Sequence, residues 1–227
     1  MRKRKVIGGG LVAIVSVCGT LAVPAADGPA KTKDAWKSLF DGKTLAGWKA
    51  ADYRDGGKVF VKDGIIVMEK GSTMTGIVYT GKDFPKMDYE VSFEGQRLAG
   101  GDFFCTTVFP VGSEFCSFVT GGWGGTIVGL SNINSENASA NITTTTKDFD
   151  NGKWYKFRLR VTKDRIRSWI GEDRVVDLDT VDRRIALHSS CGPCKPFGFA
   201  TWKTTGAVRA IRVRPLTAEE RKPAEDK

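Results

Sequence analysis

The segment Met87-Asp88-Tyr89-Glu90-Val91-Ser92-Phe93-Glu94 alternates apolar and polar side chains without interruption. Successive side chains of a β-strand point to opposite faces of a sheet, so the odd-numbered residues share one face and the even-numbered residues the other. The apolar face belongs against a core, and the polar face belongs toward solvent or a groove. The pattern therefore predicts an antiparallel strand with one buried face.

Similar short strand patterns lie on both sides of this segment. They are the apolar or alternating runs at residues 59–61, 65–68, 154–161, 165–170 and 208–213. The first two are joined by Lys62-Asp63-Gly64, and an Asp-Gly turn between apolar runs indicates a hairpin. Short strands at regular intervals, separated by turn residues and almost without a helical period, predict one all-β sandwich or barrel domain over residues 38–216.

The N-terminus has the pattern of an export signal. Four basic residues at positions 2–5 precede an uncharged apolar stretch, and the small residues Pro24-Ala25-Ala26 follow it. We predict a signal peptide over residues 1–26 and a flexible lead-in over residues 27–37. The alternatives are a retained membrane anchor, because the stretch approaches the length of a span, and a lipoprotein cut before Cys18.

Export predicts a periplasmic, cell-surface or secreted location and no membrane span after cleavage. The formal charge is +9 for the whole chain. The four basic residues of the signal leave with it, so the remaining chain carries +5. Its basic residues are interleaved with acids, and Arg212 and Arg214 share one face of the closing strand. These features favour a solvated sheet face over nucleic-acid binding. Residues 217–227 are expected to form a polar tail.

Four cysteines remain once Cys18 has left with the signal, and an even number in an oxidising compartment predicts disulfides. Cys105 and Cys116 flank the turn residues 110–113, so a hairpin there is expected to bring them opposite each other at bonding distance. The alternative is a pair of buried free thiols. Cys191-Gly192-Pro193-Cys194 matches the thioredoxin tetrapeptide, but loop and strand follow it. A short-loop disulfide or a loose metal clip is therefore expected rather than redox chemistry.

The segment Ser38-Leu39-Phe40-Asp41-Gly42-Lys43-Thr44-Leu45-Ala46-Gly47-Trp48 resembles the opening motif of the 3-keto-disaccharide hydrolase family. The family's early hairpin, central strand, late hairpin and closing strand resemble residues 62–67, 88–94, 151–170 and 208–214. The resemblance therefore covers roughly residues 38–216. It implies a two-sheet antiparallel jelly-roll sandwich, similar to concanavalin and laminin-G domains, and a glycoside substrate.

The resemblance also implies a chemistry. Family members act on sugars oxidised at C3, where the ketone acidifies the C2 proton. A base removes this proton, the C1 glycosidic bond breaks by elimination, and water then adds. Such a reaction needs a base near the C2 hydrogen and a cation or strong donor at the developing enolate. This chain reads Gly100-Gly101-Asp102-Phe103-Phe104 where members carry Asn-Ser-Gly and then Arg, so no family site residue is carried over.

Three residues are candidates for catalysis. Glu90 and Glu94 share the polar face of the alternating strand, and we expect them to lie about 6.5–7 Å apart, within reach of a paired-carboxylate mechanism. The alternative is a solvated strand face. His188 is the only histidine of the chain. It is a candidate general base, and the alternative is a structural histidine.

Four residues are candidates for substrate binding. Trp123 lies in Gly121-Gly122-Trp123-Gly124-Gly125 and offers a flat ring for stacking on a sugar, or else folds into the core. Asp102 can bind a sugar hydroxyl or a cation, or can cap a turn. Asn132 and Asn141 lie in a long polar loop and can bond sugar hydroxyls or form turns. The sequence specifies no cofactor, and a divalent cation such as calcium is one candidate.

Together these features predict an exported carbohydrate-active protein whose partner is a glycoside or polysaccharide. The leading interpretation is a hydrolase or lyase of 3-keto-glycosides. The alternative is a non-catalytic carbohydrate-binding or cell-surface module of the same fold.

Overall fold

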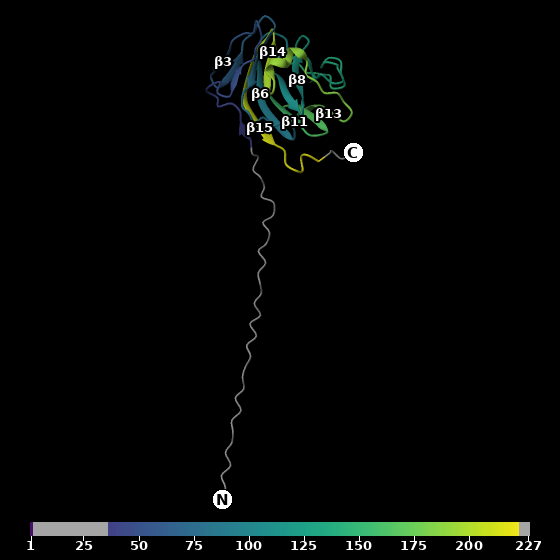
Figure 1. The fold of residues 1–227 in the computed structure, drawn as a ribbon. Helices are drawn as coiled ribbons and strands as arrows, with labels where there is room; N and C mark the ends of the chain where they lie inside the picture. Colours follow the sequence, from purple (N-terminus) through teal and green to yellow (C-terminus); the bar gives the residue numbers. More distant parts are fainter. Residues whose placement is uncertain (2–35, 223–227) are drawn as a thin grey trace. The chain divides into compact units, whose positions relative to one another are not determined.

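The computed structural model describes residues 36–222 together with Met1 (Figure 1). The predicted signal peptide, nearly all of the predicted lead-in and the last five residues lie outside the described part. The described chain forms two antiparallel β-sheets and one short helix, which confirms the all-β, two-sheet jelly-roll prediction.

One sheet has eight strands. In order across the sheet they are β13 (Asp173–Asp179), β12 (Arg165–Ile170), β11 (Trp154–Val161), β6 (Tyr89–Ala99), β15 (Thr205–Pro215), β4 (Ile65–Met68) and β3 (Val59–Lys62), with β1 (Lys37–Ser38) also paired to β15. The other sheet has seven strands, in the order β10 (Thr145–Thr146), β9 (Ile127–Ser131), β8 (Glu114–Gly122), β7 (Thr106–Val111), β14 (Gly198–Trp202), β5 (Met74–Tyr79) and β2 (Trp48–Ala50). The 3₁₀ helix η1 spans Ser189–Cys194.

The core lies between the two sheets, and β6 supplies its centre. Tyr89, Val91 and Phe93 are fully buried, as the alternation in the sequence predicts. The ring of Phe93 stacks on Phe157 of β11 at 5.0 Å and meets Phe199 of β14 edge-on at 4.8 Å. Because Phe199 belongs to the other sheet, these aromatic contacts hold the two layers together.

The hairpin of β7 and β8 contradicts the predicted Cys105–Cys116 disulfide. Its turn pairs Val111 with Glu114, so Cys105 lies opposite Thr120 and Cys116 lies opposite Phe109. Strands rise about 3.3 Å per residue, so this four-residue offset separates the two cysteines by about 13 Å. Both are buried free thiols, and burial raises the pKa of Cys116 to about 12.

The predicted disulfide between Cys191 and Cys194 is also wrong, since both are buried free thiols of η1. They pack on the outer surface of the seven-stranded sheet with a small apolar cluster that includes Tyr53. The Tyr53 hydroxyl lies 3.4 Å from Cys194 Sγ. Burial is the main reason that the pKa values of both thiols are raised, so neither is an activated thiolate.

The chain after β15 packs back onto the eight-stranded sheet. The Thr217 backbone N–H donates to the Glu220 carboxylate and the Glu220 N–H donates to the Thr217 hydroxyl, which is the reciprocal pattern of a capping box. Glu220 also accepts hydrogen bonds from Arg214 and Arg160, and the Arg214 bond is the main reason that the pKa of Glu220 falls to about 2. This part of the predicted polar tail is therefore bound to the sheet.

Candidate functional site

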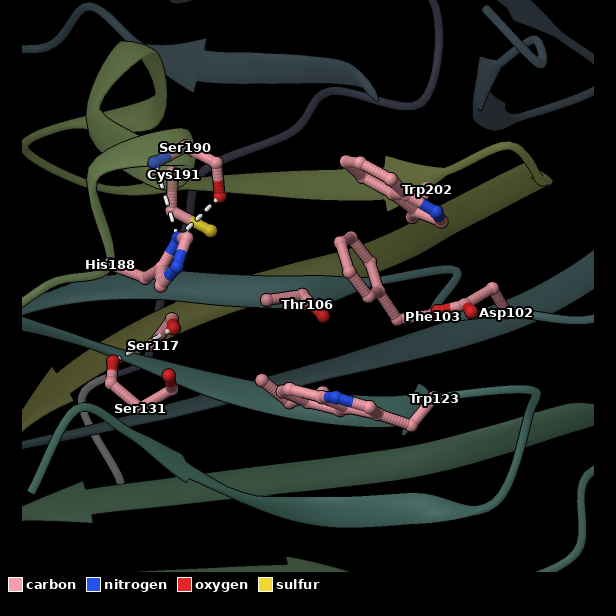
Figure 2. Close-up of a pocket in the computed structure, with 11 residues that line it drawn as sticks. Asp102, Phe103, Thr106, Ser117, Trp123, Ser131, His188, Ser190, Cys191 and Trp202 are labelled. Atoms are coloured by element: carbon pink, nitrogen blue, oxygen red, sulfur yellow. Dashed lines mark hydrogen bonds between the residues drawn. The ribbon is translucent and has the colours of Figure 1, made fainter. Parts of the chain in front are cut away.

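A pocket of about 300 Å³ lies on the outer face of the seven-stranded sheet, away from the core (Figure 2). Asp102 and Phe103, which lie just before β7, form one part of its lining. Outward-facing residues of β7, β8 and β9 form a second part, and His188 with η1 and the end of β14 form the rest. Segments far apart in the sequence therefore meet here. One end of the pocket is aromatic and the other is polar.

The aromatic end consists of Phe103, Trp123 and Trp202. Figure 2 shows Trp123 on one side of the pocket, and Phe103 and Trp202 on the other. Trp123 lies at the β8–β9 turn with a positive φ of 49° and is 50% exposed. The rings of Phe103 and Trp202 lie 6.3 Å apart. Two aromatic walls thus face each other across an open space.

Asp102 fixes the geometry of this end. One carboxylate oxygen accepts the Phe103 N–H at 2.7 Å, and the other accepts the Gly124 N–H at 3.1 Å. The side chain therefore ties the segment that carries Phe103 to the turn that carries Trp123. The turn-capping alternative for Asp102 is present in the structure, and it serves the pocket by holding both walls in place.

The polar end centres on His188, the residue that caps η1. Its Nδ1 atom accepts the Ser190 N–H at 3.3 Å and lies 2.7 Å from the Ser190 hydroxyl. When Nδ1 is the acceptor, neutral imidazole carries its proton on Nε2 and can donate a hydrogen bond there. The other tautomer, with Nδ1–H donating to the Ser190 hydroxyl, leaves Nε2 free to accept a proton. Ser117 lines the same end and donates to the Ser131 carbonyl at 3.0 Å.

Thr106 lies on the pocket floor between the two ends (Figure 2). It is fully buried, and its hydroxyl has no hydrogen-bond partner in the described structure. An unsatisfied buried hydroxyl costs about 1–3 kcal/mol. A polar group of a ligand would supply the missing partner once the side chains that cover this hydroxyl shift.

The structure brings three of the predicted site residues together and places the others elsewhere. Asp102, Trp123 and His188 all line the pocket. Asn132 lies beside it, where its side-chain oxygen accepts from the Ser131 hydroxyl at 2.6 Å. Asn141 is buried and bonds four groups of its own loop and the Leu130 carbonyl of β9, so it organises the loop and has no capacity left for a sugar.

The paired-carboxylate prediction for Glu90 and Glu94 is wrong in distance and in place. Four residues of strand separate their Cα atoms by about 13 Å, twice the expected value. Both lie on the outer face of the eight-stranded sheet, outside the pocket. Glu90 is 1% exposed and hydrogen-bonded to Arg160 and Arg214, so a substrate cannot reach it.

The sequence did not single out the residues that complete the pocket, namely Phe103, Thr106, Ser117, Val119, Ser131, Ser190 and Trp202. Apart from Trp202, they are common residue types at outward positions of strands or turns. A signal was present in the cross-strand register, which sets Ser117 opposite Ser131 and Thr106 opposite Ala200 and so gathers small side chains on one face. This register could not be predicted from the sequence, because it depends on the turns that join the strands.

Among residues 36–222, no group of three or more His, Cys, Asp or Glu side chains is arranged to hold a metal ion. Within the same described part, none of the helices has the length and apolar character that crossing a bilayer requires.

Comparison with solved structures establishes the fold. Domain 4 of AbnA, a GH43 extracellular arabinanase from Geobacillus stearothermophilus solved with arabinotriose, has a TM-score of 0.52 at 15% identity, covering 82% of this chain and 95% of that one. The Crh5 transglycosylase gives 0.53 at 12% identity, with 80% and 84% covered. A putative glycosyl hydrolase from Parabacteroides distasonis gives 0.50 at 12% identity, with 80% and 94% covered.

No curated protein matches the sequence. The family model described as a 3-keto-alpha-glucoside-1,2-lyase-like domain matches residues 35–214, most of the chain and all but one of its strand residues. Its limits agree with the extent of the two sheets, which begin at Lys37 and end at Pro215. The chain therefore belongs to the 3-keto-alpha-glucoside-1,2-lyase-like domain family.

Proposed function

We propose that this protein is exported and that its pocket binds a sugar unit of a glycoside or polysaccharide. The observation that carries the proposal is a pocket in which Trp123 lies opposite Phe103 and Trp202, with polar side chains on its floor and at one end (Figure 2). A pyranose has apolar C–H faces and polar hydroxyl edges. Trp123 opposite Phe103 and Trp202 suits the faces, and Thr106 suits an edge hydroxyl.

The polar end of the pocket also supports the proposal that the pocket binds a sugar. With Nδ1 accepting the Ser190 N–H, the Nε2–H of His188 is a donor, and Ser117 adds a hydroxyl nearby. A few directed polar groups in a mostly apolar pocket are the usual arrangement of a small-ligand site. The basic and apolar N-terminal segment supports export.

Substitution of Thr106 by Val is expected to separate binding from folding. Val keeps the shape and removes the hydroxyl, so affinity for the bound saccharide should fall about fivefold, the equivalent of one neutral hydrogen bond. Stability should stay unchanged or rise by up to about 1 kcal/mol, because a buried unpaired hydroxyl is removed. Calorimetric titration with a saccharide selected on a glycan array, together with urea unfolding, measures both quantities.

Trp123→Ala in the same titration should weaken binding about tenfold or more, because a stacking face is lost. Val181→Ala is the matched control, since Val181 is an exposed apolar residue outside the pocket. A folded protein that binds no saccharide on the array would reject the proposal. A stability loss in Thr106→Val would show that the hydroxyl has a structural partner instead.

A second candidate function is lyase chemistry on 3-keto-glycosides, and the His188–Ser190 pair favours it. In the tautomer that donates Nδ1–H to the Ser190 hydroxyl, which gives up the bond from the Ser190 N–H, Nε2 can take the C2 proton of the sugar. The electron pair of the C2–H bond then forms the enolate with the C3 ketone, and the Thr106 hydroxyl is available to donate to the C3 oxygen. Collapse of the enolate breaks the bond from C1 to the leaving oxygen, which takes the proton that His188 has accepted, and water then adds to the 1,2-unsaturated sugar that remains.

His188→Gln tests this candidate. If His188 is the base, the turnover rate of a 3-keto-glucoside should fall about a hundredfold or more while the KM changes little. Val181→Ala again serves as the control, and the rate is followed by release of the C1 alcohol. Absence of turnover by wild-type protein that still binds saccharide would reject the lyase and leave the binding function in place.

A further inference from the structure

A second ordered set of polar side chains covers the outer face of the eight-stranded sheet. There β6 lies between β11 and β15, and three of its outward residues are Glu90, Ser92 and Glu94. Each has a basic residue opposite it on both neighbouring strands. The three cross-strand rows are Arg160–Glu90–Arg214, Arg158–Ser92–Arg212 and Lys156–Glu94–Arg209.

The two outer rows contain their own counter-charge. Glu90 accepts from Arg160 Nε at 2.8 Å and from Arg214 at 3.1 Å. Glu94 accepts from Arg209 Nε at 2.7 Å. The middle row has Ser92 where the others have a carboxylate. It therefore sets two guanidinium side chains on either side of a hydroxyl that carries no charge.

Two of the cations beside this gap, Arg212 and Lys156, have no acidic partner among the described residues. No described carboxylate lies within ion-pair distance of Arg212 or of Lys156, whereas Arg158 has only a long 3.8 Å approach to Glu90. The Arg212 guanidinium lies over the Trp36 ring, 4.6 Å from its centroid. An Arg held on an aromatic face keeps its N–H edges available for an anion.

A surface hollow of about 470 Å³ lies at this position, bounded by Lys156, Arg212, Trp36, Ser38 and Ser92. Glu94 also borders it, with its carboxylate engaged by Arg209. The hollow combines two cations that lack acidic partners, the Ser92 hydroxyl and one aromatic wall, whereas the Ser38 hydroxyl already donates to the Phe40 carbonyl at 2.8 Å. Its polar groups are therefore mainly donors and the Glu94 carboxylate is neutralised, so the hollow is complementary to an anion.

The backbone of β15 is irregular at the same place. Between Arg209 and Arg212 the strand contains one more residue than β6 opposite, which is a β-bulge. Ala210 borders the hollow and has a positive φ of 51°, an unfavourable conformation for a residue with a Cβ atom. Bulges re-aim side chains and occur at functional places. The residue that the bulge places at the hollow is Ala210, whose side chain is a single methyl group and not a long chain.

We propose that this hollow is a second binding site and that it takes an oxyanion substituent of a saccharide, either a sulfate ester or a carboxylate. Arg212 and Lys156 would contact the oxyanion, because a guanidinium and an ammonium both donate charge-assisted hydrogen bonds to such groups. Ser92 would donate to one of its remaining oxygens, and Trp36 would pack against the sugar ring. This site lies on the opposite sheet from the pocket of Thr106 and does not require that pocket to function.

Ser92→Glu is the decisive variant, because it supplies the carboxylate that the middle row lacks. Titration uses a sulfated heparin-derived oligosaccharide, a carboxylated oligogalacturonate and a neutral cello-oligosaccharide, each with the full protein. Wild type should bind one or both anionic sugars, and Ser92→Glu should weaken that binding about tenfold or more, since a charge-assisted bond is lost and a like charge is added. Ser92→Gln, of the same size but neutral, should retain it. Equal binding by wild type and Ser92→Glu would overturn the proposal.

Charge-matched control variants distinguish binding at the hollow from nonspecific electrostatic attraction of anions to the protein. Lys156→Ala with Arg212→Ala removes two positive charges at the hollow, and Lys82→Ala with Lys163→Ala removes two at exposed places elsewhere. Only the first pair should abolish binding. An equal loss with the second pair, or equally tight binding of a DNA oligonucleotide of the same charge, would overturn a saccharide site. Thr106→Val should leave this binding unchanged, so failure here and failure of the pocket can be told apart.

Discussion

Glu90→Gln is expected to lower the free energy of unfolding by about 3–5 kcal/mol, the range measured when one partner of a buried ion pair is removed. The Glu90 side chain is 2% exposed, and the Arg160 and Arg214 side chains that it bonds are only 16% and 9% exposed. A neutral amide would leave two neighbouring guanidinium groups in a poorly solvated place with less counter-charge. Urea unfolding at neutral pH measures the loss.

Glu94→Gln is the matched control, because it makes the same substitution on the same face of the same strand. The Glu94 and Arg209 side chains are 23% and 41% exposed, so water already screens their charges. Exposed pairs contribute about 0–1 kcal/mol, and a loss in that range is expected. Equal losses in the two variants would contradict the description of Glu90 as the buried centre of the cluster. Any loss of function in Glu90→Gln has to be interpreted with its lower stability in mind.

The contrast between these two glutamates shows what the sequence could predict about the fold. Alternation over residues 87–94 was enough to assign the inner face, and Tyr89, Val91 and Phe93 are indeed in the core. The same pattern left Glu90 and Glu94 equivalent. Their difference comes from neighbours on β11 and β15, which lie about 70 and 120 positions away in the sequence.

The cysteines show the same limit at shorter range. A hairpin between Cys105 and Cys116 was correctly predicted, but which residues face each other depends on the turn. The turn pairs Val111 with Glu114, and this pairing sets Cys105 against Thr120. When the turn of a hairpin shifts along the sequence, every cross-strand pair of residues changes. A disulfide therefore cannot be inferred only from two cysteines that lie at similar distances on either side of a turn.

The candidate site was predictable where a residue is unusual and not where it is common. Trp123 among glycines, the single His188 and Asp102 after two glycines stand out in the sequence, and all three line the pocket. Thr106, on the floor of the pocket, is an ordinary strand residue. Only its buried and unpartnered hydroxyl distinguishes it, and that property exists only in the folded chain.

Gly206→Ala should destabilise the protein by about 3 kcal/mol, the upper part of the usual range for overpacking, because the obstacle is backbone. Gly206 lies in β15, and a Cβ atom there would come within 2.0 Å of the Phe104 carbonyl oxygen. Phe104 belongs to the segment that enters β7 in the other sheet. The two layers can approach this closely only because residue 206 has no side chain.

The same contact links the core to the pocket, since Phe104 directly follows Asp102 and Phe103. Displacement of Phe104 should therefore loosen the bonds from Asp102 to the Phe103 and Gly124 N–H groups, and saccharide affinity should fall together with stability. Gly101→Ala is the control, because Gly101 precedes the same segment and a Cβ atom there meets nothing within 4 Å. Urea unfolding and saccharide titration of both variants measure the two effects. A Gly206→Ala protein with wild-type stability would show that the sheets can separate locally at little cost, and that the aromatic walls do not depend on this close approach.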